Sequence, residues 1–368
     1  MSILAHSVQI NNGLAETSAD GAALAFDVKY GIMFCAYMPG FQGNYGESRG
    51  KIALSYFPAS QPTNIRFVTV AEGDDVYCHN MLGLGDGKVR VFYEKNSRAE
   101  GDHTVCFKDY DFIQNTLTSE KSVMVKTDSG DLFPLCLSLQ FQYLEDHGYH
   151  DHSYLCTEQI GHCEYFRGKD SYTYGAAVSY LAEPILYRSA DDGATVEFFA
   201  IYPRTVQYEF EYRILNGKIY AIYRTNRPTN SISFTSSDDM GKTWSEPVDY
   251  EGSIQCRPRI LVYNGHILTS HNYFNDDTEN RPAIQQGRTS IRLTYGEDLG
   301  PGKSTIVADL YSKCGIVNIC LADILNDLYL AYSTSELALE YQNYPYEGGM
   351  VRGKDSIRYV KLGDLIPE

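Results

Sequence analysis

Short apolar runs recur along the chain, and a tight turn rich in Asn, Asp or Gly precedes most of them. The runs lie at residues 31–37, 88–93, 218–223, 266–270 and 328–332. The turns before the last four are Asp86-Gly87, Asn216-Gly217, Asn264-Gly265 and Asn326-Asp327. Asn-Gly and Asp-Gly between apolar runs are strong β-hairpin signals. Because no long segment carries a 3.6-residue period, the pattern predicts an all-β protein.

The recurrence of these hairpins indicates a repeat architecture. We predict that residues 1–368 form a single β-propeller domain with four-stranded antiparallel blades, six in number, at about 50–60 residues a blade. The predicted blades cover residues 20–72, 76–130, 133–205, 206–252, 255–311 and 313–364. The third is too long, which predicts an inserted loop near residues 135–170. A seventh blade within that segment is the alternative.

One turn carries a complete motif. Ser237, Asp239, Gly241, Thr243 and Trp244 fit the pattern S-x-D-x-G-x-T-W, known as an Asp-box. The Asp carboxylate can accept hydrogen bonds from N–H groups of the turn, and Gly supplies an open backbone conformation. A near-complete copy spans residues 189–196, with Val in place of Trp, and a worn copy spans residues 294–300.

These motifs resemble those of the sialidase (BNR-repeat) superfamily. The resemblance implies that the Asp-boxes are structural and lie away from the active face. It also implies an arginine triad that grips a substrate carboxylate, a Tyr–Glu nucleophile pair and an Asp acid/base. Glu209 and Arg224 flank the Asn216-Gly217 turn as the family's Glu and second Arg do, and Arg288 would be the third Arg, with Arg281 as the other choice.

The chain departs from the family at two places. No R-I-P-like segment with the first Arg occurs near the first blade, and Ile316 stands where the nucleophilic Tyr would begin the last blade. Ile cannot attack an anomeric carbon, so the resemblance in fold does not by itself imply sialidase activity.

The hairpin assignment predicts which side chains share the ligand-binding face of the propeller. They come from loops that lead into innermost strands or that follow second strands. The candidates on this face are His79, Asn80, Glu94, His162, Glu209, Arg224, Arg257, His271 and Tyr273.

Three functions remain open. The first is a carbohydrate-active enzyme, a sialidase-like exo-glycosidase that cleaves an acidic or plant or host glycan with two carboxylates. Glu209 is its first carboxylate. The candidates for the second carboxylate are Glu94, Asp109 and Glu164.

The second function is a polysaccharide lyase acting on a uronate-containing glycan, which needs a base, an acid and a cation for the carboxylate. The candidates are His79, His152 or His162 as base, Tyr154 or Tyr273 as acid, and Arg224 or Arg257 as cation. The third function is a non-catalytic propeller that binds glycans. Clustering of titratable residues on one face favours an enzyme.

The net charge of the chain narrows the classes of molecule that it is expected to bind. The formal net charge is −16 and the pI is near 5.0. Such a balance disfavours nucleic acid and anionic membranes, whereas a few arginines in one pocket can still hold a small carboxylate. We therefore expect an oligo- or polysaccharide as partner, and the sequence leaves the oligomeric state open.

Histidine and cysteine bear on cofactors and location. Residues 146–154 hold three of the nine histidines, and Cys156, His162 and Cys163 follow. The spacing fits no standard zinc pattern, so we expect no cofactor, with zinc or calcium as the alternative. Nine irregularly spaced cysteines and a start without a basic or apolar leader region favour a cytoplasmic protein, unless a leader precedes this sequence.

Overall fold

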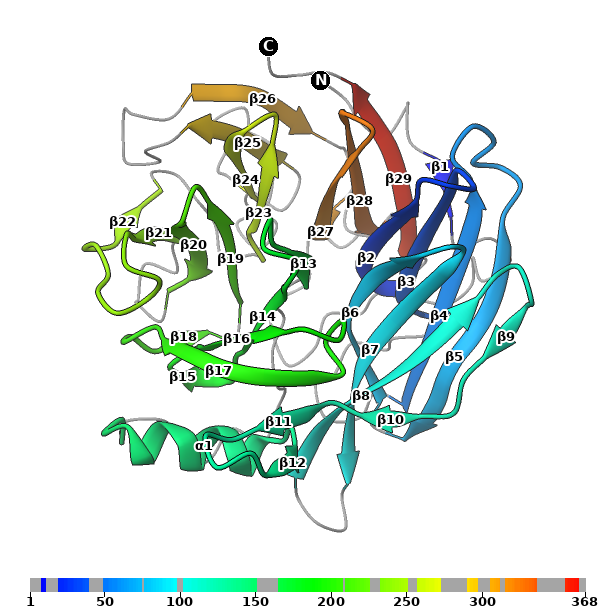
Figure 1. Ribbon diagram of the computed structural model, residues 1–368. Helices are drawn as coiled ribbons and strands as arrows, with labels where there is room; N and C mark the ends of the chain where they lie inside the picture. The colour runs from blue at the N-terminus through cyan, green and yellow to red at the C-terminus, as the bar shows by residue number, and fades with distance from the viewer. Residues whose placement is uncertain are drawn as a thin grey trace, which may run out of the picture.

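The protein is a six-bladed β-propeller. The computed structural model describes residues 8–10, 19–39, 49–74, 76–97, 102–150, 165–207, 209–225, 232–250, 257–272, 290–296, 305–311, 315–335 and 355–363. Over these ranges the strands form six sheets of four or more strands, arranged as a ring in chain order (Figure 1). The predicted fold class is therefore confirmed, and the alternative of a seventh blade is wrong.

Four blades are built from consecutive strands. Blade 1 consists of β2 (Ala19–Asp27), β3 (Ile32–Pro39), β4 (Arg49–Pro58) and β5 (Arg66–Asp74). Blade 2 consists of β6 (Val76–Gly85), β7 (Lys88–Ser97) and β8 (Asp102–Asp111), with β9 (Thr116–Leu117) and β10 (Lys121–Ser122) as an interrupted outer strand. Blade 4 consists of β19 (Phe210–Leu215), β20 (Lys218–Arg224), β21 (Ile232–Ser237) and β22 (Val248–Asp249). Blade 5 consists of β23 (Arg259–Tyr263), β24 (His266–Asn272), β25 (Ser290–Gly296) and β26 (Thr305–Tyr311).

Blade 3 is larger than the others. Its antiparallel core consists of β13 (Phe166–Arg167), β14 (Thr173–Ala177), β16 (Ile185–Ser189) and β17 (Thr195–Ile201). Two further strands, β11 (Met124–Lys126) and β12 (Leu132–Pro134), extend its outer edge, where β11 pairs parallel with β17. A separate two-stranded sheet joins β15 (Tyr180–Ala182) to β18 (Val206–Gln207).

A helix, α1 (Leu137–Asp146), lies within the predicted insertion, where the sequence analysis expected only a loop. It buries Leu137, Gln140, Phe141 and Leu144. These positions follow the i, i+3, i+4, i+7 spacing of one helix face. The segment is only ten residues long, so its periodicity is easily missed in the sequence.

Blade 6 closes the ring with both ends of the chain. It consists of β27 (Gly315–Ile324), β28 (Asp327–Ser335) and β29 (Asp355–Gly363), completed by β1 (Val8–Gln9). Val8 pairs with Tyr359, and the Ile10 N–H donates to the Ile357 carbonyl at 2.9 Å. The sequence analysis drew this blade from residues 313–364 alone and missed its N-terminal strand.

The predicted hairpin turns adopt the expected backbone conformation. Asp86 and Gly87 have φ values of 51° and 78°, and Asn216 and Gly217 have 53° and 78°. Positive φ at both central residues matches the twist of the flanking strands. In blade 6 the positive values fall on Leu325 and Asn326, one residue earlier than predicted.

The predicted Asp-box of blade 4 is held by a network of its own side chains. The Ser237 hydroxyl donates to Asp239 at 2.8 Å and accepts from the Gly241 N–H at 2.8 Å. Asp239 also accepts from the Thr243 N–H at 2.8 Å and the Thr243 hydroxyl at 2.6 Å. These bonds from Thr243 lower the pKa of Asp239 to about 2. The Trp244 indole N–H donates to the Gly241 carbonyl at 3.1 Å.

The near-complete copy in blade 3 forms the same bonds. The Ser189 hydroxyl donates to Asp191 at 2.7 Å and accepts from the Gly193 N–H at 2.8 Å, and the Thr195 N–H donates to Asp191 at 2.7 Å. Although burial opposes it, these bonds lower the pKa of Asp191. The two turns are thus structurally equivalent despite the loss of Trp.

The glycine of each of these turns packs against the preceding blade. A Cβ added to Gly193 would lie 2.8 Å from Phe92 of blade 2, and one added to Gly241 would lie 2.5 Å from Ala200 of blade 3. The turns therefore lock neighbouring blades together at the face opposite the start of the innermost strands.

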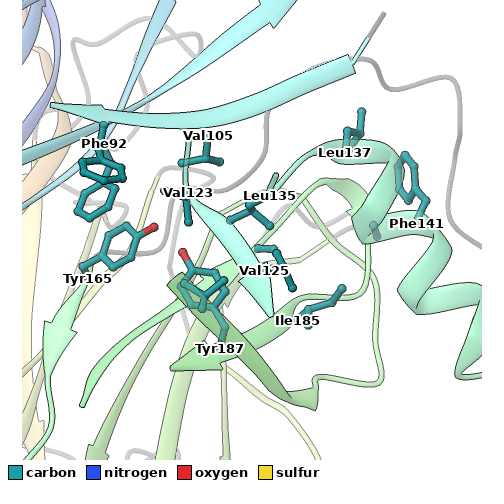
Figure 2. Packing of buried hydrophobic residues seen from close by; sticks show 14 of the residues in the cluster. Phe92, Val105, Val123, Val125, Leu135, Leu137, Phe141, Tyr165, Ile185 and Tyr187 are labelled. Atoms are coloured by element: carbon teal, nitrogen blue, oxygen red, sulfur yellow. The ribbon is translucent and has the colours of Figure 1, made fainter. Parts of the chain in front are cut away.

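Blades 2 and 3 share a large apolar core. The rings of Phe92 and Tyr165 stack with their centroids 4.0 Å apart, and Leu137 and Phe141 of α1 belong to the same cluster (Figure 2). Burying such side chains contributes about 1.5–3 kcal/mol each. Blade 2, blade 3 and the helix are thus held as one unit.

We expect Gly241→Ala to destabilise the protein by about 2–4 kcal/mol, because two effects act together. The new side chain strains the backbone at a φ of 90°, and its Cβ clashes with Ala200. Gly217→Ala is the matched control, since its φ is 78° and no atom lies within 4 Å of the added Cβ. It should cost about 1 kcal/mol. Urea unfolding measures both, and equal losses would contradict the inter-blade contact.

We expect Asp239→Asn to lower the melting temperature near neutral pH and to lose this effect in acid. The folded-state pKa of Asp239, about 2, lies below the ordinary value of 3.8. The carboxylate therefore stabilises the fold above its unfolded pKa, and this contribution is lost as the pH falls through about 2. Melting curves of both proteins from about pH 6 to about pH 2 test this expectation. A constant difference would contradict it.

Candidate functional site

The face where the innermost strands begin, here named the inlet face, carries the candidate site. The innermost strands of neighbouring blades contact one another around the centre, as β2 contacts β6 and β27, and as β23 contacts β19 and β27. Each second strand runs antiparallel to the first, so it ends on the inlet face. The opposite face, which carries the hairpin and Asp-box turns, is here named the turn face.

Glu209 and Arg224 come together on the inlet face, as the hairpin predicts. Glu209 directly precedes β19 and Arg224 ends β20. The Arg224 N–H donates to the Glu209 carbonyl at 3.0 Å, and the guanidinium lies 3.5 Å from the carboxylate. The Glu209 side chain is 11% exposed and the Arg224 side chain 14%, so neither is fully enclosed.

A second carboxylate, Glu211, lies deeper and is fully enclosed. Its side chain is 0% exposed, and it is 3.6 Å from Arg213 and 3.3 Å from Arg257. It also accepts a hydrogen bond from Arg259. Glu211 therefore joins β19 of blade 4 to the segment that leads into and forms β23 of blade 5.

The arginines extend this cluster to two more blades. Arg259 donates to the Ile319 carbonyl on β27 of blade 6. Arg213 lies over the ring of Phe166 in blade 3, 4.8 Å from its centroid. Four blades thus meet around one carboxylate near the centre of the propeller.

Glu209 and Arg257 are among the residues predicted from the sequence, whereas Glu211, Arg213 and Arg259 are not. The signal was available, because charged residues at 209, 211 and 213 alternate along one predicted strand. Residues at i, i+2 and i+4 of a strand share one face. Glu211, Arg213 and Arg259 are buried, and buried charges are stable only when they pair with one another.

Two candidates of blade 2 are buried. The carboxylate of Glu94 lies 3.7 Å from the His103 ring, and both side chains are at most 3% exposed. Asn80 is 2% exposed, and its side-chain oxygen accepts from the Met81 N–H at 2.6 Å. His79 belongs to β6, but its side chain lies outside the described residues.

His271 in blade 5 is also buried. It is 1% exposed, and its ring lies 4.7 Å from that of Tyr250 at the end of blade 4. Burial raises the pKa of Tyr250 to about 12, and its hydroxyl lies 3.2 Å from the Thr269 hydroxyl. The contact between His271 and Tyr250 therefore connects blades 4 and 5, and His271 does not point into open solvent.

Asp109 lies on the turn face, away from Glu209. Arg90 binds its carboxylate with two bonds of 2.7 and 2.9 Å and also donates to the carbonyls of Asp191 and Asp192. Asp109 thus supports the Asp-box turn of blade 3, and it cannot act as the second carboxylate beside Glu209. Six other candidates lie outside the described residues: His152, Tyr154, His162, Glu164, Tyr273 and Arg288.

Two further features of the described residues concern metal sites and membrane-spanning helices. Over those residues no group of three His, Cys, Asp or Glu side chains is arranged to hold a metal ion. The helix that the structure describes is too short and too polar to cross a bilayer.

Comparison by sequence finds nothing: no family model matches the chain, and no curated protein does. Comparison of folds finds many solved structures. The sialidase of Trypanosoma rangeli, solved with sialic acid, matches with a TM-score of 0.61 at 12% identity, over 95% of this chain and 55% of that one. This chain therefore spans about half the length of that sialidase.

Two further structures match over more of their own length. A protein of unknown function from Dyadobacter fermentans has a TM-score of 0.59 at 12% identity, over 97% of this chain and 98% of that one. A mutant of the NanB sialidase from Streptococcus pneumoniae has a TM-score of 0.56 at 13% identity, over 97% and 70% respectively. At these identities the likeness establishes a sialidase-like fold.

We expect Glu211→Gln to destabilise the protein by about 3–5 kcal/mol, because it leaves buried guanidinium groups without their counter-ion. Glu197→Gln is the control, since that side chain is 40% exposed and pairs with Lys126 at the surface. It should cost at most about 1 kcal/mol. Equal midpoints in urea for the two variants would show that the central cluster adds no stability.

Proposed function

We propose that the protein is a carbohydrate-active enzyme that cleaves a glycosidic bond of an acidic glycan, in the manner of a sialidase-like exo-glycosidase. The observation that carries the proposal is the pairing of Glu209 with Arg224 on the inlet face, with both side chains partly exposed. A carboxylate and a guanidinium in reach of one ligand combine a reactive group with a cation for a substrate carboxylate.

The proposed roles follow from the chemistry of the two groups. Glu209 acts as base or nucleophile at the anomeric centre, and Arg224 binds an acidic group of the sugar. Arg257, whose side chain is 8% exposed, pairs with Glu211 two residues along the chain from Glu209. The net charge of −16 then requires that anion binding depends on these local arginines.

We also propose that the chain is a divergent member of the sialidase (BNR/Asp-box) superfamily. Two turns with the same Ser–Asp–Gly hydrogen bonds support this. Ile316, the second residue of β27, stands where the family's Tyr is expected, so the proposed reaction uses Glu209 without a tyrosine nucleophile.

The second carboxylate of a two-carboxylate mechanism stays a prediction. Glu94 is 2% exposed at its side chain and lies beside His103, which favours a structural role. Glu164 lies outside the described residues.

We expect the protein to release sugar from one class of acidic oligosaccharide, and Glu209→Gln to lower kcat/KM at least about 100-fold. A screen of sialosides, arabinans and uronate-containing oligosaccharides, read by new reducing ends and by absorbance of an unsaturated uronate, identifies the class. Glu246→Gln is the control, since that side chain is 89% exposed and pairs with Arg204.

The outcomes separate the proposed reactions. New reducing ends that disappear in Glu209→Gln support the hydrolase. Absorbance that survives Glu209→Gln would instead identify a lyase, and binding without product would identify a non-catalytic glycan-binding propeller.

A further inference from the structure

Strand β18 of the two-stranded sheet β15–β18 ends two residues before Glu209 in the chain. Tyr180 pairs with Gln207 and Ala182 pairs with Val206, and the register shifts between these pairs. This sheet crosses from blade 3 to the segment that leads into β19 (Figure 1). The last residue of the pairing is thus only two positions from the proposed catalytic carboxylate.

Helix α1 contacts the chain that leads into this sheet, because its residue Gln140 bonds to Ser179 and Ala177. Ala182 of β15 belongs to the same apolar cluster as Phe141 and Leu144 of α1. Leu137 and Phe141 of α1 belong to the cluster that also contains Ile185 (Figure 2). The helix therefore packs against the segment that carries β15.

A buried polar contact fixes the helix to this segment. The Gln140 side chain is 0% exposed, accepts from the Ser179 hydroxyl at 2.6 Å and donates to the Ala177 carbonyl at 3.3 Å. Gln is rarely buried without hydrogen-bond partners, because a buried polar group that lacks a partner has lost its bonds to water without replacing them. These two bonds hold the backbone immediately before β15 in one position.

The backbone of β15 is itself strained. Leu181 has a φ of 56°, in the left-handed region that branched residues avoid. Such a conformation persists only where the surrounding structure imposes it, and it is common at functional sites. The contacts of α1 on one side and β18 on the other supply that support.

We propose that α1 positions the carboxylate of Glu209, with Gln140 and Ser179 as positioning residues that act through β15 and β18. The inference rests on the proposed function of Glu209. Movement of β18 would also displace Arg224, because its N–H is bound to the Glu209 carbonyl. The helix thus belongs to the proposed active site although none of its residues touches the substrate.

The test compares two substitutions of the same type on the same helix. Gln140→Met removes both buried hydrogen bonds with little change in length. Gln142→Met makes the same change on the exposed face, where Gln142 bonds to Asp146 of its own helix. Ser179→Ala removes one hydroxyl and serves as the second variant if Gln140→Met does not fold.

Two measurements are made on each full-length variant. Hydrogen exchange followed by mass spectrometry reports the protection of residues 206–207. Steady-state kinetics on the substrate class found in the screen reports kcat, KM and the pH profile.

Gln140→Met and Ser179→Ala should speed exchange at residues 206–207 at least about 10-fold and lower kcat about 10- to 100-fold, with KM nearly unchanged. The acidic limb of the kcat–pH profile should shift, which a loss of stability alone would not produce. Gln142→Met should match the wild type in all of these.

Unchanged exchange at residues 206–207 would overturn the proposal, whatever happens to the activity. Faster exchange with kcat and the pH profile unchanged would overturn it as well. A wild-type protein that turns over no glycan contradicts the proposed function and with it the catalytic part of the inference. The exchange measurement still decides whether α1 controls the position of β18.

Discussion

The carboxylate of Glu211 must neutralise guanidinium groups in a place that water does not reach, and the centre of the propeller is organised around this requirement. Removing such charges from water costs several kcal/mol per ion, which is offset only when all partners are in position. Arg257 and Arg259 come from blade 5, and Arg259 continues to a carbonyl of blade 6. One arrangement of these blades satisfies the cluster, so the charges specify how the blades meet.

The burial of Glu211 among its arginine partners also determines which side chains near β19 reach the inlet face. On β19, Phe210 and Tyr212 pack with apolar residues of blade 3, and they alternate along the chain with Glu209, Glu211 and Arg213. A shift of one residue would exchange the apolar and charged sets, at a high cost in free energy. Once Glu211 is held inside the cluster, Glu209, two residues earlier in the chain, is placed beside Arg224.

Local signals in the sequence predicted the blades and the Glu209–Arg224 pair, because a tight Asn-Gly turn brings residues 15 apart to opposite strands. Closure by β1 could not be predicted in this way, since two residues carry no clear period and their partner, Tyr359, lies at the far end of the chain. To predict the cluster around Glu211, one would have to know which strands become neighbours in the fold. The side chain of His79 and the whole of Arg288 lie outside the described residues, so the roles of these two residues stay predictions.

Burial divides the two neighbouring carboxylates between two tasks. Glu211, at 0% exposure and surrounded by arginines, is committed to holding blades together and cannot meet a sugar. Glu209, two residues earlier, is 11% exposed and lies 3.5 Å from the Arg224 guanidinium. Carboxylates of the same type thus acquire different chemistry from their surroundings alone. Because Ile316 supplies no nucleophile, the proposed reaction depends on Glu209, and its position depends on the buried cluster below and the β15–β18 sheet beside it.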